Sequence, residues 1–560
     1  MPGLYGVKNK PFGIGTLKVK TAESALVSWK PTVKKIAGEL VLLVGGALLF
    51  ALAFPSFVSE KGFGAVAFIA LVPVFVLVHR SSWRLIAVYG VLYGFISYAL
   101  FNFWLSTFHP LAILIVPTIY AVYFLIVFPL LKLADTLFPR YGYLIQVLIW
   151  IGYEYLRSKG YLGYPYGNIG YSQYQFIPFI QISAITGFWG VSALVVFFSA
   201  YLGNAIKDGF QDLRGFFKQH RYELGGYVGL LIITLIYGVT VQQDYSDQRQ
   251  WKVALVQHNA DTWAGGVRTY RRNLDTLKSL SEQALEHDPE IVIWSETAFV
   301  PGVDWHTKYR TDGERYALVK DFREFMQGQT VPFLTGNDDG QLADPNLPPV
   351  AADGSYNRVD YNAVLLYHEN ELKETYRKTH LVPFTEHFPY GHIFPRFYQL
   401  LLEKDYHFWE EGNEYTVFEV GGVKFSTPIC FEDVFGYISR RFVREGAEVI
   451  VNMTNDSWSG SVASQMQHLG MAVFRAVENR RSLVRGTNSG MTATIDPDGR
   501  IIDMIPAFER DYMISSVPVY TERITPYTRW GNYFPVIAIV LSGLALLTGI
   551  LVRIMFRRDD

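Results

Sequence analysis

The chain contains a single cysteine, Cys430, among its 560 residues, which excludes an internal disulfide. It also has few charges, because only 18% of the residues are Asp, Glu, Lys or Arg, against roughly a quarter in a typical globular domain. The formal net charge is −1, so the basic excess expected of a nucleic-acid-binding protein is missing. Half of the residues are hydrophobic. We therefore expect a membrane protein with lipid, and no nucleic acid, among its partners.

The apolar residues gather in two parts of the chain. Residues 36–245 contain seven long apolar runs, and residues 530–560 contain an eighth followed by a basic tail. A helix needs about 20 mostly apolar residues to cross a membrane. The predicted spans are residues 40–59, 62–78, 85–108, 110–131, 141–155, 177–205, 224–243 and 530–552. Residues 1–35 are expected to be a cytoplasmic extension, and residues 246–529 have the composition of a soluble α/β domain.

Basic residues in the short loops predict the orientation of the spans. Those that flank the spans on one side are Lys18, Lys20, Lys30, Lys34, Lys35, Arg80, Arg84, Arg140, Lys207, Arg214, Lys218, Arg221, Arg553, Arg557 and Arg558. They share a side only if the chain has eight spans, which predicts that both termini are cytoplasmic and that the soluble domain lies outside. Arg157 and Lys159, just after the fifth span, are the exception.

Strand and helix patterns alternate in the soluble domain. Helical spacing of Met466, Leu469 and Val473 predicts a helix over 463–480, and composition predicts another over 267–287. Runs of β-forming residues predict strands at 251–257, 291–294, 331–334, 363–367, 418–425 (a hairpin), 447–453, 482–485, 491–495 and 500–504. This order predicts two sheets covered by helices.

Three residues in this domain combine into a candidate catalytic group. Cys430 follows an apolar β-like run in TPICFED (residues 427–433), while Glu296 lies in WSET and Lys378 in YRKTHLVPF. Taken singly, a cysteine of this kind is usually a core thiol, and the lysine and glutamate are usually surface or ion-pair residues. Together they suggest a nucleophile, with Glu296 as base and Lys378 holding a thiolate and stabilising an oxyanion.

The order Glu, Lys, Cys, carried by WSETA (294–298), RKTHLVPFTE (377–386) and ICFE (429–432), resembles the carbon–nitrogen hydrolase (nitrilase) superfamily. Within it the segments look like the membrane-bound branch, the apolipoprotein N-acyltransferases, and the resemblance covers nearly the whole chain. It implies a multi-pass bundle of eight spans in the bacterial inner membrane. It also implies one periplasmic catalytic domain, an α-β-β-α sandwich.

The resemblance also implies roles for further residues. Glu386 matches a second essential carboxylate, and Glu432 matches a supporting acid after the cysteine. Trp263 corresponds to a tryptophan on a substrate-binding loop. Phe431 stands where many relatives have tyrosine, which leaves it an aromatic packing role beside the substrate.

The implied reaction takes an acyl chain from a membrane phospholipid, holds it as a thioester on Cys430, and transfers it to the N-terminal amine of the diacylglyceryl-cysteine of an apolipoprotein. This is the last step of bacterial lipoprotein maturation. We expect no cofactor and no metal, because no His-Glu-x-x-His spacing occurs and the twelve histidines are scattered. His468 is therefore interpreted as structural or as a surface residue.

Two alternatives remain at this point. A membrane-tethered amidase would use the same three residues on a small amide and would release ammonia. A scaffold or transporter with a degenerate nitrilase domain would have no need of an intact triad, and Glu296, Lys378 and Cys430 are all present.

Overall fold

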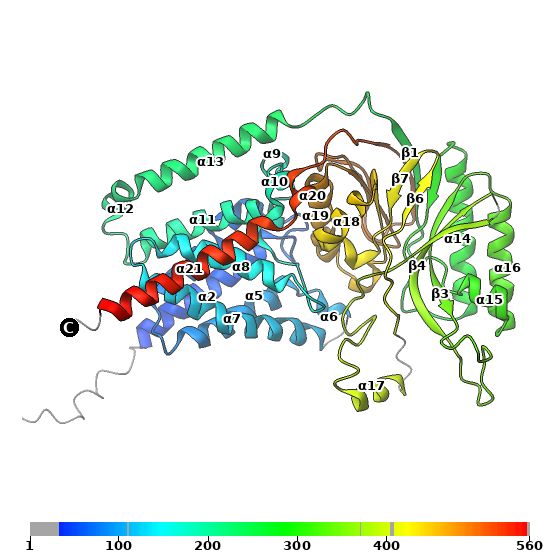
Figure 1. Cartoon of the computed structure of the whole chain (residues 1–560), viewed down its shortest axis with the longest axis horizontal. Coiled ribbons are helices and arrows are strands. Elements are labelled where there is room, and N and C mark those ends of the chain that lie inside the picture. Colours follow the sequence, from blue (N-terminus) through cyan, green and yellow to red (C-terminus); the bar gives the residue numbers. More distant parts are fainter. Residues whose placement is uncertain (1–32, 109–110, 370, 404–407, 557–560) are drawn as a thin grey trace, which may run out of the picture.

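The structure, a computed structural model, describes residues 33–108, 111–369, 371–403 and 408–556. Nearly all of the predicted cytoplasmic extension lies outside these residues. A bundle of helices forms one half of the molecule, and a sandwich of two sheets forms the other half (Figure 1). The first residues of α2 (Val33–Ala53), helix α12 (Leu213–Gln219) and the end of α21 (Tyr533–Phe556) lie at the end of the bundle farthest from the sandwich.

The bundle contains long apolar helices and several short ones. Within the described residues, five helices are long and apolar enough to cross a membrane, namely α2, α7 (Ala112–Leu137), α11 (Phe188–Ile206), α13 (Arg221–Thr240) and α21. The other described elements of this half are α3 (Ala67–Ala70), α4 (Val72–Arg80), α5 (Ile86–Phe101), α6 (Leu105–Phe108), α8 (Gly142–Arg157), α9 (Ile177–Ile180), α10 (Ser183–Thr186), α20 (Pro526–Trp530) and the 3-10 helices η1 (Gly64–Val66) and η2 (Ile169–Gln173). The eight-span count therefore stays a prediction.

Three predicted spans are broken in the structure. The run 62–78 is divided between α3 and α4, and 85–108 between α5 and α6. The run 177–205 is divided among α9, α10 and α11, and α11 begins after Gly187, whose φ of 67° is a left-handed conformation that favours glycine. Hydrophobicity alone does not reveal these breaks, because a buried turn can be as apolar as the helices it joins.

The sandwich consists of two six-stranded sheets. The first has the order β12-β1-β2-β3-β4-β5 and the second β11-β10-β9-β8-β7-β6. The strands are β1 (Gln250–Gln257), β2 (Ile291–Ile293), β3 (Phe333–Gln341), β4 (Val359–His368), β5 (Glu371–Arg377), β6 (Val417–Val420), β7 (Val423–Ser426), β8 (Val449–Thr454), β9 (Ser482–Thr487), β10 (Thr492–Ile495), β11 (Ile501–Ile505) and β12 (Asp511–Pro518). In each sheet, three neighbouring strands are parallel, β1-β2-β3 and β7-β8-β9, and the outer pairs are antiparallel.

Helices cover both outer faces, which gives a nitrilase-like four-layer fold. Helices α14 (Val267–Leu285), α15 (Val303–Tyr309) and α16 (Gly313–Gln327) pack on the side of the first sheet, and α18 (Gly436–Arg444) and α19 (Val462–Asn479) on the side of the second. A short helix, α17 (Pro395–Leu402), projects from the sandwich (Figure 1). Strands β5 and β12 are absent from the sequence prediction. In the case of β5, the reason is that it is a polar edge strand with four exposed residues at its start.

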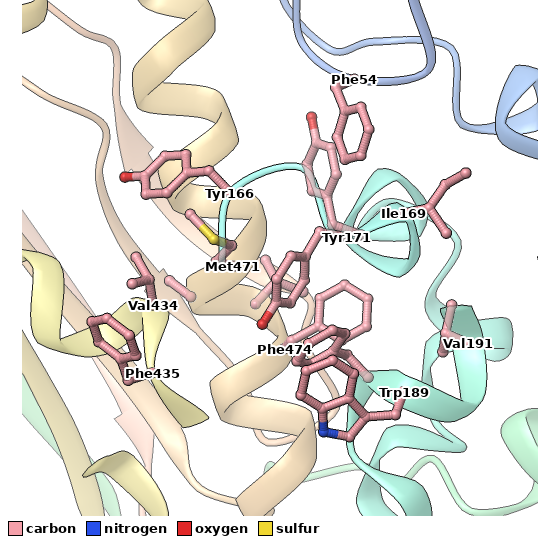
Figure 2. Close-up of a cluster of buried hydrophobic side chains, with 14 of the residues drawn as sticks. Phe54, Tyr166, Ile169, Tyr171, Trp189, Val191, Val434, Phe435, Met471 and Phe474 are labelled. Atoms are coloured by element: carbon pink, nitrogen blue, oxygen red, sulfur yellow. The ribbon is translucent and has the colours of Figure 1, made fainter. Parts of the chain in front are cut away.

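Helix α19 joins the sandwich to the bundle, and all of its residues after Val462 are buried. Its Gln467 donates to the carbonyl of Pro55 at 2.8 Å and accepts from the Trp104 indole at 3.1 Å. Figure 2 shows the apolar part of this contact, in which side chains of the bundle and of the sandwich pack together. The labelled residues are Phe54, Tyr166, Ile169, Tyr171, Trp189, Val191, Val434, Phe435, Met471 and Phe474. One hydrophobic core therefore runs through both halves of the molecule.

Arg157 and Lys159 are the basic residues that do not fit the predicted orientation of the spans. Both have contacts that account for their position. Arg157 is buried and donates to the Tyr120 hydroxyl and to the carbonyls of Tyr164 and Tyr166. Lys159 lies over the rings of Tyr155 and of Tyr437, which belongs to α18 of the sandwich. Arg157 thus ties the loop after α8 to α7, and Lys159 links this loop to α18 of the sandwich, so neither is a free loop charge.

Candidate active site

The structure brings the candidate residues together at the ends of strands from both sheets. Glu296 follows β2, Lys378 follows β5 directly, and Cys430 follows β7. Parallel strands end at one edge of a sheet, and residues just beyond them converge there. All three side chains are nearly or fully buried, with exposures of 5% for Glu296, 0% for Lys378 and 8% for Cys430.

Glu296, Lys378 and Glu386 form a group that we call the lysine cluster. The Lys378 ammonium donates to Glu386 Oε1 at 2.7 Å and to Glu296 Oε1 at 3.4 Å. Burial opposes the charge of the ammonium, but the two carboxylates outweigh it and raise the pKa of Lys378 above its ordinary value. Lys378 is thus held as a cation, and its third N–H has no acceptor among the described residues.

Two asparagines fix Glu296 in place. The side chain of Asn362, on β4, donates to Glu296 Oε1 at 2.8 Å, and the backbone N–H of Asn455 donates to Oε2 at 2.8 Å. The charges of the lysine cluster also affect the pKa of the Cys430 thiol. Burial first, and then the carboxylate of Glu296, raise the pKa of Cys430 well above its ordinary value, although the Lys378 ammonium acts in the opposite direction. Burial and Glu296 therefore favour the thiol over the thiolate, so the thiol needs a base when it reacts. The role of Lys378 in holding a thiolate stays a prediction.

The backbone at Cys430 is strained. Its φ of 48° is in the left-handed region, and Thr297, next to Glu296, has a φ of 45°. Such a conformation costs a non-glycine residue of the order of 1–3 kcal/mol, and it persists where the surrounding structure imposes it. Here Asn452 donates its side-chain amide to the carbonyls of Pro428 and Cys430, at 3.0 and 3.3 Å. The turn therefore holds the cysteine at a fixed angle at the start of a short 3-10 helix, Cys430–Val434.

Glu432 connects the cysteine turn to the lysine turn. One of its carboxylate oxygens accepts from the N–H of Ile429 at 2.7 Å. The other accepts from the N–H groups of Thr379 and His380, at 2.8 and 3.0 Å. The Tyr376 hydroxyl lies 2.9 Å from both oxygens. Glu432 is fully buried, so its position beside Cys430 and Lys378 is set by these contacts.

The two residues predicted to bind substrate lie in different surroundings. Phe431 is 8% exposed and its ring lies among those of Tyr164, Tyr166, His380 and Phe435. Trp263 is 65% exposed, on a loop that reaches the site through its neighbour Thr262, which donates to Asn455 at 3.1 Å. Phe431 thus faces the loop after α8, whereas Trp263 lies on the solvent side.

A second buried group, which we call the arginine cluster, reaches the cysteine turn through Asn452. Arg485 donates to Asp433 at 2.8 Å, to Asp456 at 2.7 Å and to Asn452 at 2.6 Å. His468 contacts the same aspartates through its two ring nitrogens, at 2.7 and 3.1 Å. Burial and Arg485 disfavour its charge, yet the two carboxylates raise the pKa of His468 to about 9. The cluster therefore supports the cysteine turn with two positive and two negative charges.

The interpretation of His468 as structural agrees with this position, but no sequence pattern indicated its partners. Asp433 directly follows the ICFE motif, whereas Asp456 lies in the turn after β8 and Arg485 lies on β9 of the second sheet. Asn362 and Asn455 also escaped prediction, since their contacts depend on how the two sheets pack. Among the described residues, no group of three or more His, Cys, Asp or Glu side chains is arranged to hold a metal ion.

Both halves of the chain match sequence families. The model for the apolipoprotein N-acyltransferase N-terminal domain matches residues 46–201, and that for carbon–nitrogen hydrolases matches residues 252–527. The structure of Saccharomyces cerevisiae Nit3, a member of branch 10 of the nitrilase superfamily, aligns with 49% of this chain and 92% of its own, at 18% identity and a TM-score of 0.35.

Two whole-length relatives extend the match. Apolipoprotein N-acyltransferase 1 of Treponema denticola is 43% identical to this chain over 519 residues, which cover 91% of this chain and 95% of that protein. Apolipoprotein N-acyltransferase 1 of Treponema pallidum is 41% identical over 530 residues, with the same coverage. By these matches over both of its halves, the chain belongs to the apolipoprotein N-acyltransferase family.

Proposed function

We propose that this protein transfers an acyl chain from a membrane phospholipid to the N-terminal amine of a diacylated apolipoprotein. Family membership supports the reaction class. The residues Glu296, Lys378 and Cys430 support a two-step route through an acyl-enzyme, because they supply a base, a cation and a nucleophile within one buried site.

The observation that carries the proposal is the place of Cys430 in the hydrophobic core that the sandwich shares with the membrane helices. Phe431, next to it, packs near Tyr164 and Tyr166 of the loop held by Arg157. A site next to the apolar helices suits an acyl donor that is held in the bilayer. A small soluble amide would gain nothing in binding from a site in that position.

In the first step, Cys430 Sγ attacks the carbonyl carbon of the phospholipid ester while Glu296 takes the thiol proton. The N–H of Lys378 that has no acceptor donates to the oxyanion of the tetrahedral intermediate. The bond from the carbonyl carbon to the glycerol oxygen then breaks. That oxygen receives the proton from Glu296 and leaves as lysophospholipid, with the acyl chain bound to Cys430 as a thioester.

In the second step, the N-terminal amine of the diacylglyceryl-cysteine attacks the thioester. Glu296 accepts the amine proton, the C–S bond breaks, and Glu296 then gives this proton to the Cys430 thiolate. Glu386 keeps Lys378 charged throughout, since it lies 2.7 Å from the ammonium. Atoms and charges balance over the two steps, with an amide and a lysophospholipid as products.

The acyl-enzyme provides the test. Incubated with phospholipid alone, the purified full-length protein should gain the mass of one acyl chain, and neutral hydroxylamine should remove it. Adding a diacylated lipopeptide with a free amine should discharge the adduct to triacylated product, and an N-acetylated lipopeptide should leave it in place.

The matched control is Cys430→Ser, which should carry no hydroxylamine-labile acyl group. Transfer that requires both substrates at once, with no adduct on Cys430, would show direct displacement and overturn the assigned nucleophile. Release of ammonia from small amides without uptake of any acyl chain would establish the amidase alternative.

The proposal includes the membrane arrangement, with eight spans in the bacterial inner membrane and a periplasmic sandwich. Three of the proposed spans are shorter than usual. They are the pair α3 and α4, taken together, then α5, and then α8. A locally thinned bilayer or flanking polar residues can accommodate them. The basic ends of α2 and α21 and helix α12 share the end of the bundle away from the sandwich (Figure 1), which supports one cytoplasmic side.

Cysteine labelling in a Cys430→Ser background tests this arrangement. Arg214 and Ala343 are both exposed, on α12 and in the loop after β3. In intact spheroplasts, an impermeant thiol reagent should label Ala343→Cys and spare Arg214→Cys until the membrane is opened. Labelling of Arg214→Cys in sealed cells would overturn the eight-span arrangement while leaving the acyl-transfer proposal standing.

A further inference from the structure

A cavity of about 470 Å³ opens at the end of the bundle farthest from Cys430. It lies between the first turns of α2, the last residues of α4 and the residues just after α11, and this end is the one away from the sandwich (Figure 1). Four cations contribute to its wall, Lys34, Lys35, Arg80 and Lys207. A volume of this size is within the range of about 300–1,000 Å³ that is usual for ligand sites.

The cations are poorly matched by the nearby carboxylates. Lys35 Nζ lies 3.9 Å from Glu39 Oε1, and Lys207 Nζ lies 3.8 Å from Asp135 Oδ1, both at the long limit of an ion pair. Within the described ranges of the chain, Lys34 and Arg80 have no carboxylate at ion-pair distance.

The remaining acid at the rim, Asp208, pairs with His79, which also lines the cavity. It lies 3.2 Å from His79 Nε2, while His79 Nδ1 contacts Asp135 at 2.9 Å. Arg80 donates its Nε to the carbonyl of Lys207 at 2.9 Å, which orients the guanidinium and leaves its two terminal nitrogens for a ligand. A planar guanidinium fork of this kind suits a phosphate.

We propose that this cavity binds the headgroup phosphate of an anionic phospholipid. Leu42 lines the cavity, and Val41 and Val44 beside it on α2 are 71% and 41% exposed on a helix apolar enough to cross a membrane. These residues provide an apolar surface for acyl chains directly below the cations. Basic pockets between helices at a membrane face are suited to such headgroups. This lipid is bound at the opposite end from Cys430, so it is a second lipid and not the acyl donor.

Basic residues at this end also serve to orient a membrane protein, and their charge attracts anionic lipid without any pocket. Helix α12 offers the matched comparison, because Arg214 and Lys218 are exposed basic residues at the same end of the bundle and do not line the cavity. Two double variants are therefore compared. One combines Lys34→Gln with Arg80→Gln in the cavity, and the other combines Arg214→Gln with Lys218→Gln on α12. Both remove two positive charges from the same side.

The experiment uses the delipidated full-length Cys430→Ser protein in detergent, titrated in native mass spectrometry with phosphatidylglycerol, phosphatidylcholine and inorganic phosphate. The protein should bind phosphatidylglycerol at least tenfold more tightly than phosphatidylcholine. Lys34→Gln with Arg80→Gln should weaken that binding roughly 30-fold, at about fivefold for each cation removed. The α12 pair should change it less than twofold, and Leu42→Trp should reduce it by filling the cavity with no change of charge.

Equal losses from the two charge pairs would show diffuse attraction and overturn the site. So would phosphatidylcholine binding as tightly as phosphatidylglycerol, or Leu42→Trp leaving the affinity unchanged. Inorganic phosphate that competes at concentrations equal to the lipid would indicate a free-anion site and contradict a lipid ligand. The readout is lipid affinity, so failure of the acyl-transfer proposal does not affect it.

Discussion

The lysine cluster and the arginine cluster are both buried groups of charges beside Cys430, but they are built differently. The lysine cluster has two carboxylates and one cation, with unequal distances of 2.7 and 3.4 Å from the ammonium. The arginine cluster has two carboxylates and two cations, and each aspartate oxygen accepts a hydrogen bond at 3.1 Å or less.

The difference indicates which cluster does chemistry. An ammonium with one unused N–H and an unbalanced charge can respond to a new negative charge nearby, which is what an oxyanion requires. In the arginine cluster the charges balance and every aspartate oxygen has a hydrogen-bond partner, so the cluster carries no excess charge for a substrate, and through Asn452 it fixes the backbone that carries the cysteine. We therefore expect changes in the lysine cluster to affect rate and changes in the arginine cluster to affect stability.

The largest effect should follow from Arg485→Met in the arginine cluster. This change leaves Asp433 and Asp456 facing each other with only His468 as counter-charge, and breaking a buried ion pair in this way costs about 3–5 kcal/mol. Thermal unfolding in detergent should show a large fall in the apparent melting temperature. Lys320→Met, which removes an exposed pair with Glu324, is the control and should change stability by less than about 1 kcal/mol. An unchanged melting temperature for Arg485→Met would contradict a structural role.

Lys378→Met should lower turnover by about 10²–10³, the usual effect of removing one oxyanion donor. Acyl transfer per folded molecule is the measurement, and the fraction of folded, membrane-inserted protein is determined alongside it. Lys373→Met is the control and should leave the rate unchanged, because Lys373 lies on β5, the strand before Lys378, and pairs there with exposed carboxylates. Wild-type turnover in Lys378→Met would remove the lysine from the mechanism.

Two of the candidate site residues, Glu296 and Cys430, were visible in the sequence because each follows a run of β-forming residues, and strand ends meet in this fold. Lys378 was visible only through the motif that contains it, since the strand before it was not predicted. Asn362 and Asn455 were not visible, since an asparagine carries no local sign that it will contact Glu296 from another strand. The same holds for Arg485, whose partners are contributed by different turns.

The fold was predictable to a similar degree. Runs of β-forming residues located β1, β2 and most later strands, but the polar edge strand β5 resembles a loop in composition. Apolar composition located the membrane helices, while the break at Gly187 depends on a backbone conformation that hydrophobicity does not encode. Local patterns therefore predict elements, and contacts between distant elements decide their ends and their chemistry.

A smaller effect, on pH dependence, should come from His468. Its pKa is raised from 6.5 to about 9 in the folded protein, so its stabilising contribution, about 3 kcal/mol, is complete below pH 6.5 and is lost as the pH rises through 9. Apparent melting temperatures between pH 6 and pH 9.5 should therefore fall. His468→Gln should be destabilised throughout and should lack this slope. A slope that persists in the variant would assign the titration to another group.

The smallest effect should come from Glu432→Gln, which changes the connection between the two clusters. Both oxygens of Glu432 face donors only, from Ile429, Thr379, His380 and Tyr376. A glutamine amide would place its own NH₂ against one set of these donors, and leaving a buried donor without an acceptor costs about 1–3 kcal/mol.

The consequence for Glu432→Gln should be a modest loss of stability with a larger effect on kcat than on KM, because Glu432 sets the distance between the cysteine turn and the lysine turn and touches no substrate. Glu445→Gln, an exposed glutamate after α18, is the control and should leave both measurements within error. The rate of acyl-enzyme formation, followed by mass, isolates the first chemical step. If KM rises while that rate is unchanged, Glu432 acts on substrate binding, and the clusters do not depend on it for their relative position.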